Sequence, residues 1–374
     1  GTPDPIGSAG QRRAPVVTLS STPAQLPHDI DDFAGRVEQV EAATRQLVHR
    51  ERGDSALRGL SVSGMPGVGK TAFAIHLAQR VRAQFPDGQF FTNLRPAGGA
   101  PRDPADVLRH FLRSAGFTDD QLPADLERLA THFRTWTSSR RALVVLDDAV
   151  SPAQVQSLLP AGPECAAVIT SRSGMPGLAG VRTVELDPLT DTEGLQMLVA
   201  VLGADRVAAE QLHALPLVEL CGHLPLAIRC VAARLQAANH WPLRNMLLHL
   251  VRSKRRLDLL SFSGIDVRRR FASSYEMLEA DAQLMFRSLA KLKSGLFSAR
   301  EAAELFGCEP EVAEMLLVRL VGEGLLRIFQ PPGDTEVGFR LHPLLRLYAK
   351  ELWPNVTVAT IHTFAERPAA ADLA

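Results

Sequence analysis

Lysine is scarce in this chain of 374 residues, which has five lysines among its 41 basic side chains. Cysteine is scarce too, and the four cysteines form no C-x-x-C pair, which argues against a zinc site and a disulfide framework. No apolar run approaches the ~20 residues of a membrane span, and no N-terminal signal peptide is evident. The formal net charge is zero, so the chain has no overall attraction to nucleic acid or membrane. We therefore expect a cytoplasmic globular protein of two to three domains.

One of the few lysines, Lys70, lies in a glycine-rich segment. Residues 64–71 read Gly-Met-Pro-Gly-Val-Gly-Lys-Thr and fit the phosphate-loop pattern G-x-x-x-x-G-K-[ST]. The apolar run 57–63 before the segment predicts a buried strand, and the apolar spacing over 72–81 predicts a helix. In that setting backbone N–H groups and the positive end of the helix converge on a phosphate chain. A chance glycine turn is the alternative interpretation.

Each residue of this segment has an expected role. Lys70 would bind the β- and γ-phosphates of a nucleotide, and the Thr71 hydroxyl would bind Mg²⁺. The residues expected to bind the nucleotide here are Gly64, Met65, Pro66, Gly67, Val68, Gly69, Lys70, Thr71 and Ala72.

A second strand with acidic residues at its end strengthens the prediction. Residues 141–148 read Arg-Ala-Leu-Val-Val-Leu-Asp-Asp, a buried parallel strand whose C-terminal end carries two carboxylates. Asp147 would hold Mg²⁺ through oxygen, and Asp148 would orient or deprotonate a water molecule. A strand followed by an acidic turn is the alternative, and the motif gains its meaning from the phosphate loop that precedes it.

An arginine follows the next apolar strand. Residues 166–170 are followed by Ser171 and Arg172, and an arginine at this edge of a sheet can contact a γ-phosphate. A solvated loop arginine is the alternative.

Strands and helices alternate along the first half of the chain. Further strands are expected at 90–94 and 183–186, and helices at 37–50, 103–115 and 123–139. The alternation predicts a parallel, three-layer α/β domain.

The second half of the chain reads differently. Residues 189–239 are helical in pattern, with breaks at Gly203 and near Pro216. Helices are expected at 274–291, 298–306 and 310–323, followed by a hairpin of 325–329 with 337–341 and a last helix from Pro343 to Pro354. Three helices and a hairpin predict a winged-helix layout.

The expected division of the chain has five parts. They are a flexible tail at 1–27, a P-loop nucleotide-binding domain at 28–188, a helical subdomain at 189–262, a winged-helix subdomain at 263–353 and a tail at 354–374.

Six motifs in order resemble the nucleotide-binding core of NB-ARC proteins, which are signal-transduction ATPases with numerous domains (STAND). The chain is most similar to the cores of actinobacterial regulators of the antibiotic-regulatory-protein type. The motifs are Leu-Pro-His-Asp-Ile-Asp-Asp-Phe-Ala-Gly-Arg ending at Arg36, the phosphate loop, Leu-Asp-Asp ending at Asp148, Thr-Ser-Arg ending at Arg172, Leu-Pro-Leu-Ala ending at Ala227, and Leu-His-Pro-Leu-Leu-Arg-Leu-Tyr-Ala ending at Ala349.

The resemblance implies three subdomains that close on one adenine nucleotide. Residues 33–37, among them Phe33, Arg36 and Val37, would contact the adenine. Pro225 would pack on the base, and His342 would reach the β-phosphate of ADP. The family is thought to be closed with ADP and to open or oligomerise with ATP.

The sequence also departs from the family pattern at two places. Pro343 follows His342 where the family has an aspartate, and His223 stands where a glycine is usual. The DNA-binding domain and repeat modules that often flank this core are not in the sequence, so we expect it to be part of a larger regulator.

Three functions are compatible with these observations. The first is a regulatory switch that binds ADP or ATP with Mg²⁺. It would hydrolyse ATP slowly at most, and the residues expected to catalyse this are Lys70, Asp147, Asp148 and Arg172. Its partners would be its own flanking domains, other proteins or further copies of itself. The second is an ATPase whose purpose is turnover. The third is a winged-helix DNA-binding protein aided by the basic stretch 244–270, although a solvated helix face is the favoured interpretation of that stretch. The expected recognition helix 310–323 carries three glutamates and one arginine, so direct DNA binding is not expected.

Overall fold

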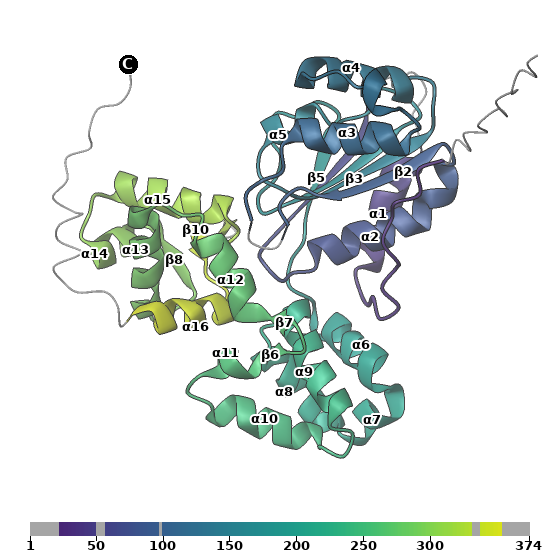
Figure 1. The fold of residues 1–374 in the computed structure, drawn as a ribbon. Helices are drawn as coiled ribbons and strands as arrows, with labels where there is room; N and C mark the ends of the chain where they lie inside the picture. The colour runs from purple at the N-terminus through teal and green to yellow at the C-terminus, as the bar shows by residue number, and fades with distance from the viewer. Residues whose placement is uncertain (1–21, 50–56, 97–98, 331–336, 354–374) are drawn as a thin grey trace, which may run out of the picture.

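The computed structural model describes residues 22–49, 57–96, 99–330 and 337–353. The predicted C-terminal tail, the hairpin loop at 331–336 and residues 1–21 of the predicted N-terminal tail lie outside these ranges. Three units are visible in Figure 1: an α/β unit, a helical unit below it and a third unit of helices and short strands to the left. None of the helices in the described ranges combines the length and apolar character that crossing a membrane requires.

The α/β unit is built on a five-stranded parallel sheet in the order β2-β3-β4-β1-β5. Because all five strands are parallel, their carboxyl ends meet at one edge of the sheet. The connections that leave the neighbouring strands β1 and β4 run toward opposite edges, so a crevice is expected between these two strands. The strands are β1 (Arg58–Ser63), β2 (Gly88–Asn93), β3 (Ala142–Ala149), β4 (Ala166–Ser171) and β5 (Val181–Glu185). The predicted three-layer parallel architecture is confirmed.

Helices cover both faces of the sheet. Leu143 and Val145 of β3 pack into the core beneath α1 (Val37–Val48) and α2 (Lys70–Val81). The alternating residues Val144 and Leu146 pack into a second core, beneath the helices on the opposite face. Burial on both sides explains why β3 is a continuous apolar run rather than an alternating one. The helices on that face are α3 (Pro104–Ser114), α4 (Leu126–Thr137) and α5 (Pro152–Gln156).

Residues 23–25 lie against this sheet, although the sequence predicts a tail as far as residue 27. The Gln89 amide donates to the Pro23 carbonyl at 2.7 Å, and the Gln25 amide donates to the Gln89 carbonyl at 2.9 Å. Ala24 thereby forms a parallel bridge with β2. The open edge of β2 pairs with this segment because its backbone groups would otherwise lack partners.

The helical unit follows from residue 191. It contains α6 (Asp191–Leu202), α7 (Ala204–Ala209), α8 (Gln211–Leu220), α9 (Pro225–Ala237), α10 (Leu243–Arg252) and α11 (Arg256–Leu259). The predicted break at Gly203 is confirmed, with φ of 88°. The predicted break near Pro216 is wrong, because Pro216 lies inside α8. The ring removes the hydrogen bond to the carbonyl of Leu212, and that residue is 87% exposed, so water can solvate the carbonyl.

The third unit contains the helices and the hairpin on which the winged-helix prediction depends. An additional short strand, β8, pairs with β10 to give an antiparallel sheet in the order β8-β10-β9. The single helix predicted over 274–291 is wrong: the chain turns at 276–279, and Leu278 inserts into the core there. The elements are α12 (Val267–Tyr275), α13 (Ala280–Ser288), β8 (Leu296–Ser298), α14 (Ala299–Phe306), α15 (Pro310–Gly322), β9 (Arg327–Phe329), β10 (Gly338–Arg340) and α16 (Pro343–Leu352). A short hairpin of β6 (Ser261–Phe262) and β7 (Ile265–Asp266) precedes α12.

Candidate nucleotide-binding site

The phosphate loop runs from the end of β1 to the start of α2, at the carboxyl edge of the sheet. Its first glycine, Gly64, has φ of 140°, and a Cβ at this position would lie 2.6 Å from the carbonyl oxygen of Leu186. Gly67 has φ of 84° and lies against Leu224 and Leu226 of the helical unit. These positions require glycine because any side chain would strain the backbone or collide with its neighbour. The loop conformation is therefore determined by the glycines of the motif.

Lys70 lies within the curve of this loop. Its Nζ donates to the carbonyl oxygens of Gly64 at 2.7 Å and Met65 at 3.1 Å. Burial lowers the pKa of Lys70 to about 8, and the nearby positive charges of Arg270 and Arg95 act in the same direction. The carboxylates of Asp148 and Asp147 oppose this shift by raising the pKa. An anion at the loop would restore the ordinary pKa of Lys70 by favouring its charged form.

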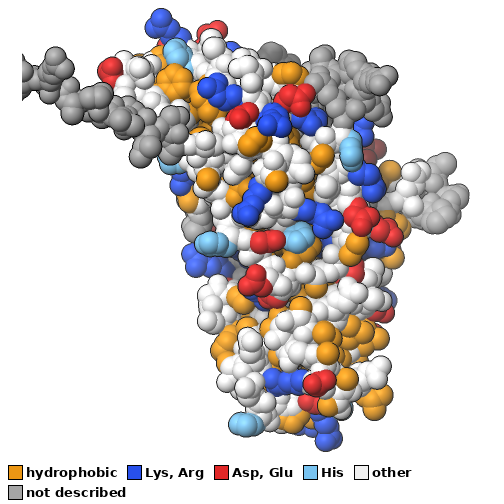
Figure 2. Space-filling model, turned by 90° about the vertical axis from the view of Figure 1, so that its right-hand side faces the viewer, with side chains coloured by type: hydrophobic (Ala, Val, Ile, Leu, Met, Phe, Trp, Pro, Cys, Tyr) orange, Lys and Arg blue, Asp and Glu red, His pale blue; other side chains and the backbone are white. Residues whose placement is uncertain are grey.

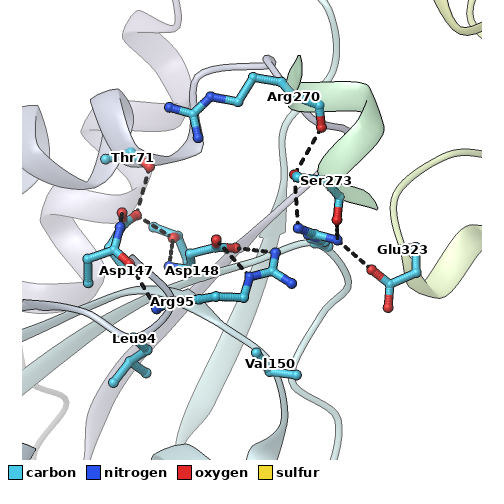
Figure 3. A network of polar contacts seen from close by, with 12 residues as sticks. Thr71, Leu94, Arg95, Asp147, Asp148, Val150, Arg270, Ser273 and Glu323 are labelled. Carbon is cyan, nitrogen blue, oxygen red and sulfur yellow. Dashed lines mark hydrogen bonds and ion pairs between the residues drawn. The ribbon is translucent and has the colours of Figure 1, made fainter. Parts of the chain in front are cut away.

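Asp147 is 3% exposed and is the centre of a hydrogen-bond network at the end of β3 (Figure 3). The hydroxyls of Thr71 and Thr170 each donate to its Oδ1 at 2.7 Å, and Asn93 Nδ2 donates to its Oδ2 at 3.0 Å. Burial raises the pKa of Asp147, whereas the two hydroxyl hydrogen bonds lower it.

The contact between Thr71 and Asp147 brings together the two residues predicted to bind Mg²⁺. Both side chains offer oxygen, which is the ligand atom that Mg²⁺ prefers. No group of three or more His, Cys, Asp or Glu side chains that could hold a metal occurs in the described ranges. A hydroxyl and a carboxylate fit the usual arrangement for Mg²⁺, in which water and substrate phosphates supply the remaining ligands.

Asp148 lies at an irregularity of β3, where the register against β4 shifts between Leu146 and Ala149. Its φ of 56° turns the carboxylate out of the strand. Arg95 Nε and Nη2 donate to the two Asp148 oxygens at 3.3 and 3.4 Å. Arg95 is 7% exposed and was not predicted as a site residue. Its only sequence signal is its place two residues after the end of β2, at the same sheet edge.

Arg172 contacts the third unit. Its Nη1 donates to the Ser273 carbonyl at 2.9 Å and to Glu323 Oε2 at 2.7 Å, and its Nη2 donates to the Ser273 hydroxyl at 3.2 Å. Burial raises the pKa of Glu323, and the charge of Arg95 lowers it. The residue predicted to contact a γ-phosphate is therefore bonded to α12 and to the end of α15.

The predicted adenine-contacting residues divide into two groups. Arg36 is 4% exposed, and its Nη2 donates to the carbonyls of Val68 at 3.0 Å and Asp187 at 2.7 Å. Phe33 stacks on His76 of α2 with ring centroids 4.2 Å apart. Phe33, Val37 and His76 line a pocket of about 190 Å³. Arg36 therefore supports the phosphate loop, while Phe33 and Val37 line the pocket beside α2.

The helical unit contacts the phosphate loop directly. Pro225 occupies the first position of α9, and a Cβ on Gly69 would lie 3.9 Å from its Cγ. The amide of Leu226 donates to the Gly67 carbonyl at 3.2 Å. Pro225 therefore lies beside Gly69 of the phosphate loop, and its packing on a base stays a prediction.

His342 contacts the helical unit rather than the phosphate loop. Its Nε2 lies 2.8 Å from the Gly222 carbonyl, and the amide of Leu344 donates to its Nδ1 at 3.2 Å. Because Nδ1 accepts a hydrogen bond, Nε2 carries the proton and the ring is neutral. Burial lowers the pKa of His342 to about 4, which is consistent with a neutral ring. His342 lines a cleft of about 790 Å³ between the helical unit and the third unit, together with Asp187 and Arg327.

The two departures from the family pattern have visible consequences. His223 adopts φ of 57°, a left-handed conformation that explains why a glycine is usual at this position. Its Nε2 lies 2.7 Å from Asp191 Oδ1. Pro343 occupies the first position of α16, where its missing N–H costs no helical hydrogen bond.

Comparison with known proteins gives two similar regulatory proteins. The chain is 39% identical over 328 residues to regulatory protein AfsR of Streptomyces griseus, covering 88% of this chain and 33% of that protein. It is 38% identical over 340 residues to AfsR of Streptomyces coelicolor, covering 90% of this chain and 34% of that protein. The chain thus spans about a third of the length of these curated relatives. No family model matches the chain.

Solved structures are similar at low TM-scores. A STAND protein with a tetratricopeptide repeat sensor from Pyrococcus horikoshii has a TM-score of 0.40 at 17% identity, covering 91% of this chain and 44% of its own. The ORC2 protein of Aeropyrum pernix has a TM-score of 0.46 at 14% identity, covering 88% of this chain and 97% of its own. As the ordered motifs predict, the chain is similar to one part, about a third, of the AfsR regulatory proteins of two Streptomyces species.

Proposed function

We propose that this chain is the nucleotide-dependent switch of a transcriptional regulator, binding ADP or ATP with Mg²⁺ where its three units meet. The observation that carries the proposal is that both other units contact the phosphate loop or its flanking strands. Leu226 of the helical unit donates to the loop at Gly67. Gly324 of the third unit lies against the loop backbone, because a Cβ there would be 3.4 Å from the Gly64 oxygen. A ligand at the loop therefore touches the region that determines how the units are arranged.

Different residues at the sheet edge would bind the phosphate chain, the Mg²⁺ ion and a water molecule. Backbone N–H groups at the start of α2, together with Lys70, would hold the phosphate chain. Thr71 and Asp147 would hold Mg²⁺, which when bound neutralises phosphate charge. Asp148 would orient a water molecule once its carboxylate is free of Arg95. Because Arg95 engages both Asp148 oxygens, we expect hydrolysis to be slow.

The switch requires that ADP and ATP differ in their affinity for two arrangements of the units. A ligand shifts such an equilibrium only by its differential affinity. Arg172, held by Glu323 and Ser273, would provide this difference if it exchanged these partners for a γ-phosphate. The arrangement described here would be the ADP-favoured one, and ATP would favour opening or association with further copies.

Direct DNA binding is not part of the proposal. On the face shown in Figure 2, basic and acidic side chains are interspersed, with no broad area of one sign. A protein that binds DNA through phosphates needs a concentrated basic surface.

The decisive experiment identifies the nucleotide released when the purified protein is denatured, and measures ADP and ATP binding by calorimetry with Mg²⁺. We expect bound ADP, and we expect Lys70→Ala to abolish binding while far-UV circular dichroism stays unchanged. Full affinity in that folded variant would refute the phosphate-loop assignment. Steady-state hydrolysis of about 1–100 s⁻¹ would instead favour an ATPase whose purpose is turnover.

A further inference from the structure

Three consecutive arginines on α12, at positions 268–270, project in different directions because neighbouring residues of a helix are 100° apart. Arg268 pairs with Glu351 at 2.9 Å and with Asp258. Arg269 and Arg270 are both exposed. Figure 3 shows the side chain of Arg270 extending from α12 across the site toward Thr71 at the start of α2. Arg270 therefore faces the phosphate loop, whereas Arg268 is held by the acidic residues Glu351 and Asp258.

The side of α12 that carries Arg270 is held in place by a contact one turn further along the helix. Ser273, three residues after Arg270, lies on the same side of α12. Its carbonyl and hydroxyl both accept hydrogen bonds from Arg172, which follows β4 of the α/β unit. The Ser273 hydroxyl in turn donates to the Arg270 carbonyl at 3.1 Å. The contact with Arg172 thus holds the Arg270 side of α12 toward the sheet edge.

The charges at this edge leave Arg270 without an acidic partner. Arg95 pairs with Asp148 at 3.3 Å, and Arg172 pairs with Glu323 at 2.7 Å. Asp147 receives its hydrogen bonds from two hydroxyls and an amide. Within the ranges that the structure describes, no ion pair or hydrogen bond engages the guanidinium of Arg270. Its positive charge also acts on Lys70, which places the two cations near one another.

We propose that Arg270 is a further nucleotide-binding residue, which contacts the phosphate chain held by Lys70 from the opposite side of the site. Two cations that face the same space repel each other unless an anion lies between them, and a guanidinium is well suited to bind phosphate oxygens. Through Arg270 the third unit would contact the nucleotide directly. This inference rests on the proposed function, because it requires a nucleotide at the phosphate loop.

The test compares two arginines on the same helix. Arg270→Ala and the matched control Arg269→Ala each remove one exposed positive charge from α12. The affinities for ADP and for a non-hydrolysable ATP analogue are measured by calorimetry with Mg²⁺. We expect Arg270→Ala to weaken both affinities about tenfold, as for loss of a partly exposed charge-assisted hydrogen bond, and Arg269→Ala to change them less than twofold. Arg270→Lys should retain part of the affinity, because it keeps the charge without the planar fork.

The outcomes separate this inference from the proposed function. If the unaltered chain binds nucleotide and both alanine variants bind equally well, the role of Arg270 is refuted while the phosphate-loop assignment stands. If the unaltered chain binds neither nucleotide, both are refuted. Thermal unfolding without nucleotide, measured for each variant, checks that the comparison is made between folded proteins.

Discussion

The lowered pKa of Lys70 predicts that nucleotide binding takes up a proton. At its pKa of about 8, Lys70 is half protonated at pH 8 in the unliganded protein. A bound phosphate chain favours the charged ammonium and returns the pKa toward its ordinary value above 10. Binding at pH 8 therefore takes up about half a proton per nucleotide, compared with about one tenth at pH 7. For the same reason the apparent affinity falls about tenfold between pH 7 and pH 9.

Calorimetry in buffers that differ in ionisation enthalpy measures this uptake directly. Because a phosphate group has its second pKa near 6, the nucleotide itself contributes little at pH 8. Asp148→Asn provides a directional control, because the Asp148 carboxylate makes the largest contribution that raises the pKa of Lys70. Its removal lowers that pKa further and should increase the uptake at pH 7.5.

The result that refutes this reasoning is a binding enthalpy that does not depend on the buffer between pH 7.5 and 8.5. Lys70 would then be fully charged before the nucleotide binds, and its burial would not lower its pKa to about 8. The same burial implies that the unliganded protein gains stability as the pH rises from 8 toward 10.5, because only the unfolded state then still holds this proton.

Three further predictions follow from particular contacts. Glu323→Gln removes the ionic partner of Arg172, so we expect the affinity for an ATP analogue to rise several-fold relative to the affinity for ADP, as measured by fluorescence titration. An unchanged ratio of the two affinities would contradict a γ-phosphate role for Arg172. Gly64→Ala should lower the free energy of unfolding in urea by about 1–3 kcal/mol more than Gly116→Ala does, because both glycines have positive φ but only a Cβ added at Gly64 would collide with a backbone oxygen. Equal losses of stability would contradict this explanation. His342 has a folded pKa of about 4, so stability should fall by up to about 3 kcal/mol as the pH drops from 6.5 toward 4, where the unfolded state binds the proton first. His342→Gln should show a shallower pH dependence, and an equally steep one would assign the effect to other groups.

The elements of the α/β unit could be predicted from the sequence because their signals are local. The loop glycines are required by the backbone itself, and β3 is apolar throughout because it is buried on both faces. The helix break that local sequence predicts near Pro216 was wrong, because exposure of a neighbouring carbonyl lets a proline remain inside a helix. The helix predicted across 276–279 was also wrong, because a turn there follows from the burial of Leu278 in a core assembled from distant segments.

The positions of candidate site residues at the C-terminal end of a strand could be predicted, whereas contacts between different units could not. Asp147, Asp148 and Arg172 lie at the sheet edge because the carboxyl ends of parallel strands meet there. Neither the pairing of Arg95 with Asp148 nor the direction of Arg270 has a sequence signature, since both depend on tertiary packing. Their positions emerge only when the units are assembled.

The guanidinium of Arg36 joins the phosphate loop to the segment that leads into the helical unit. It binds the loop at Val68 and the connection to the helical unit at Asp187, with almost no access to water. If the proposed opening moved Asp187 away from the loop, it would break a charge-assisted hydrogen bond that solvent cannot replace at once. In the proposed switch, this bond would oppose opening and would lengthen the lifetime of the arrangement described here.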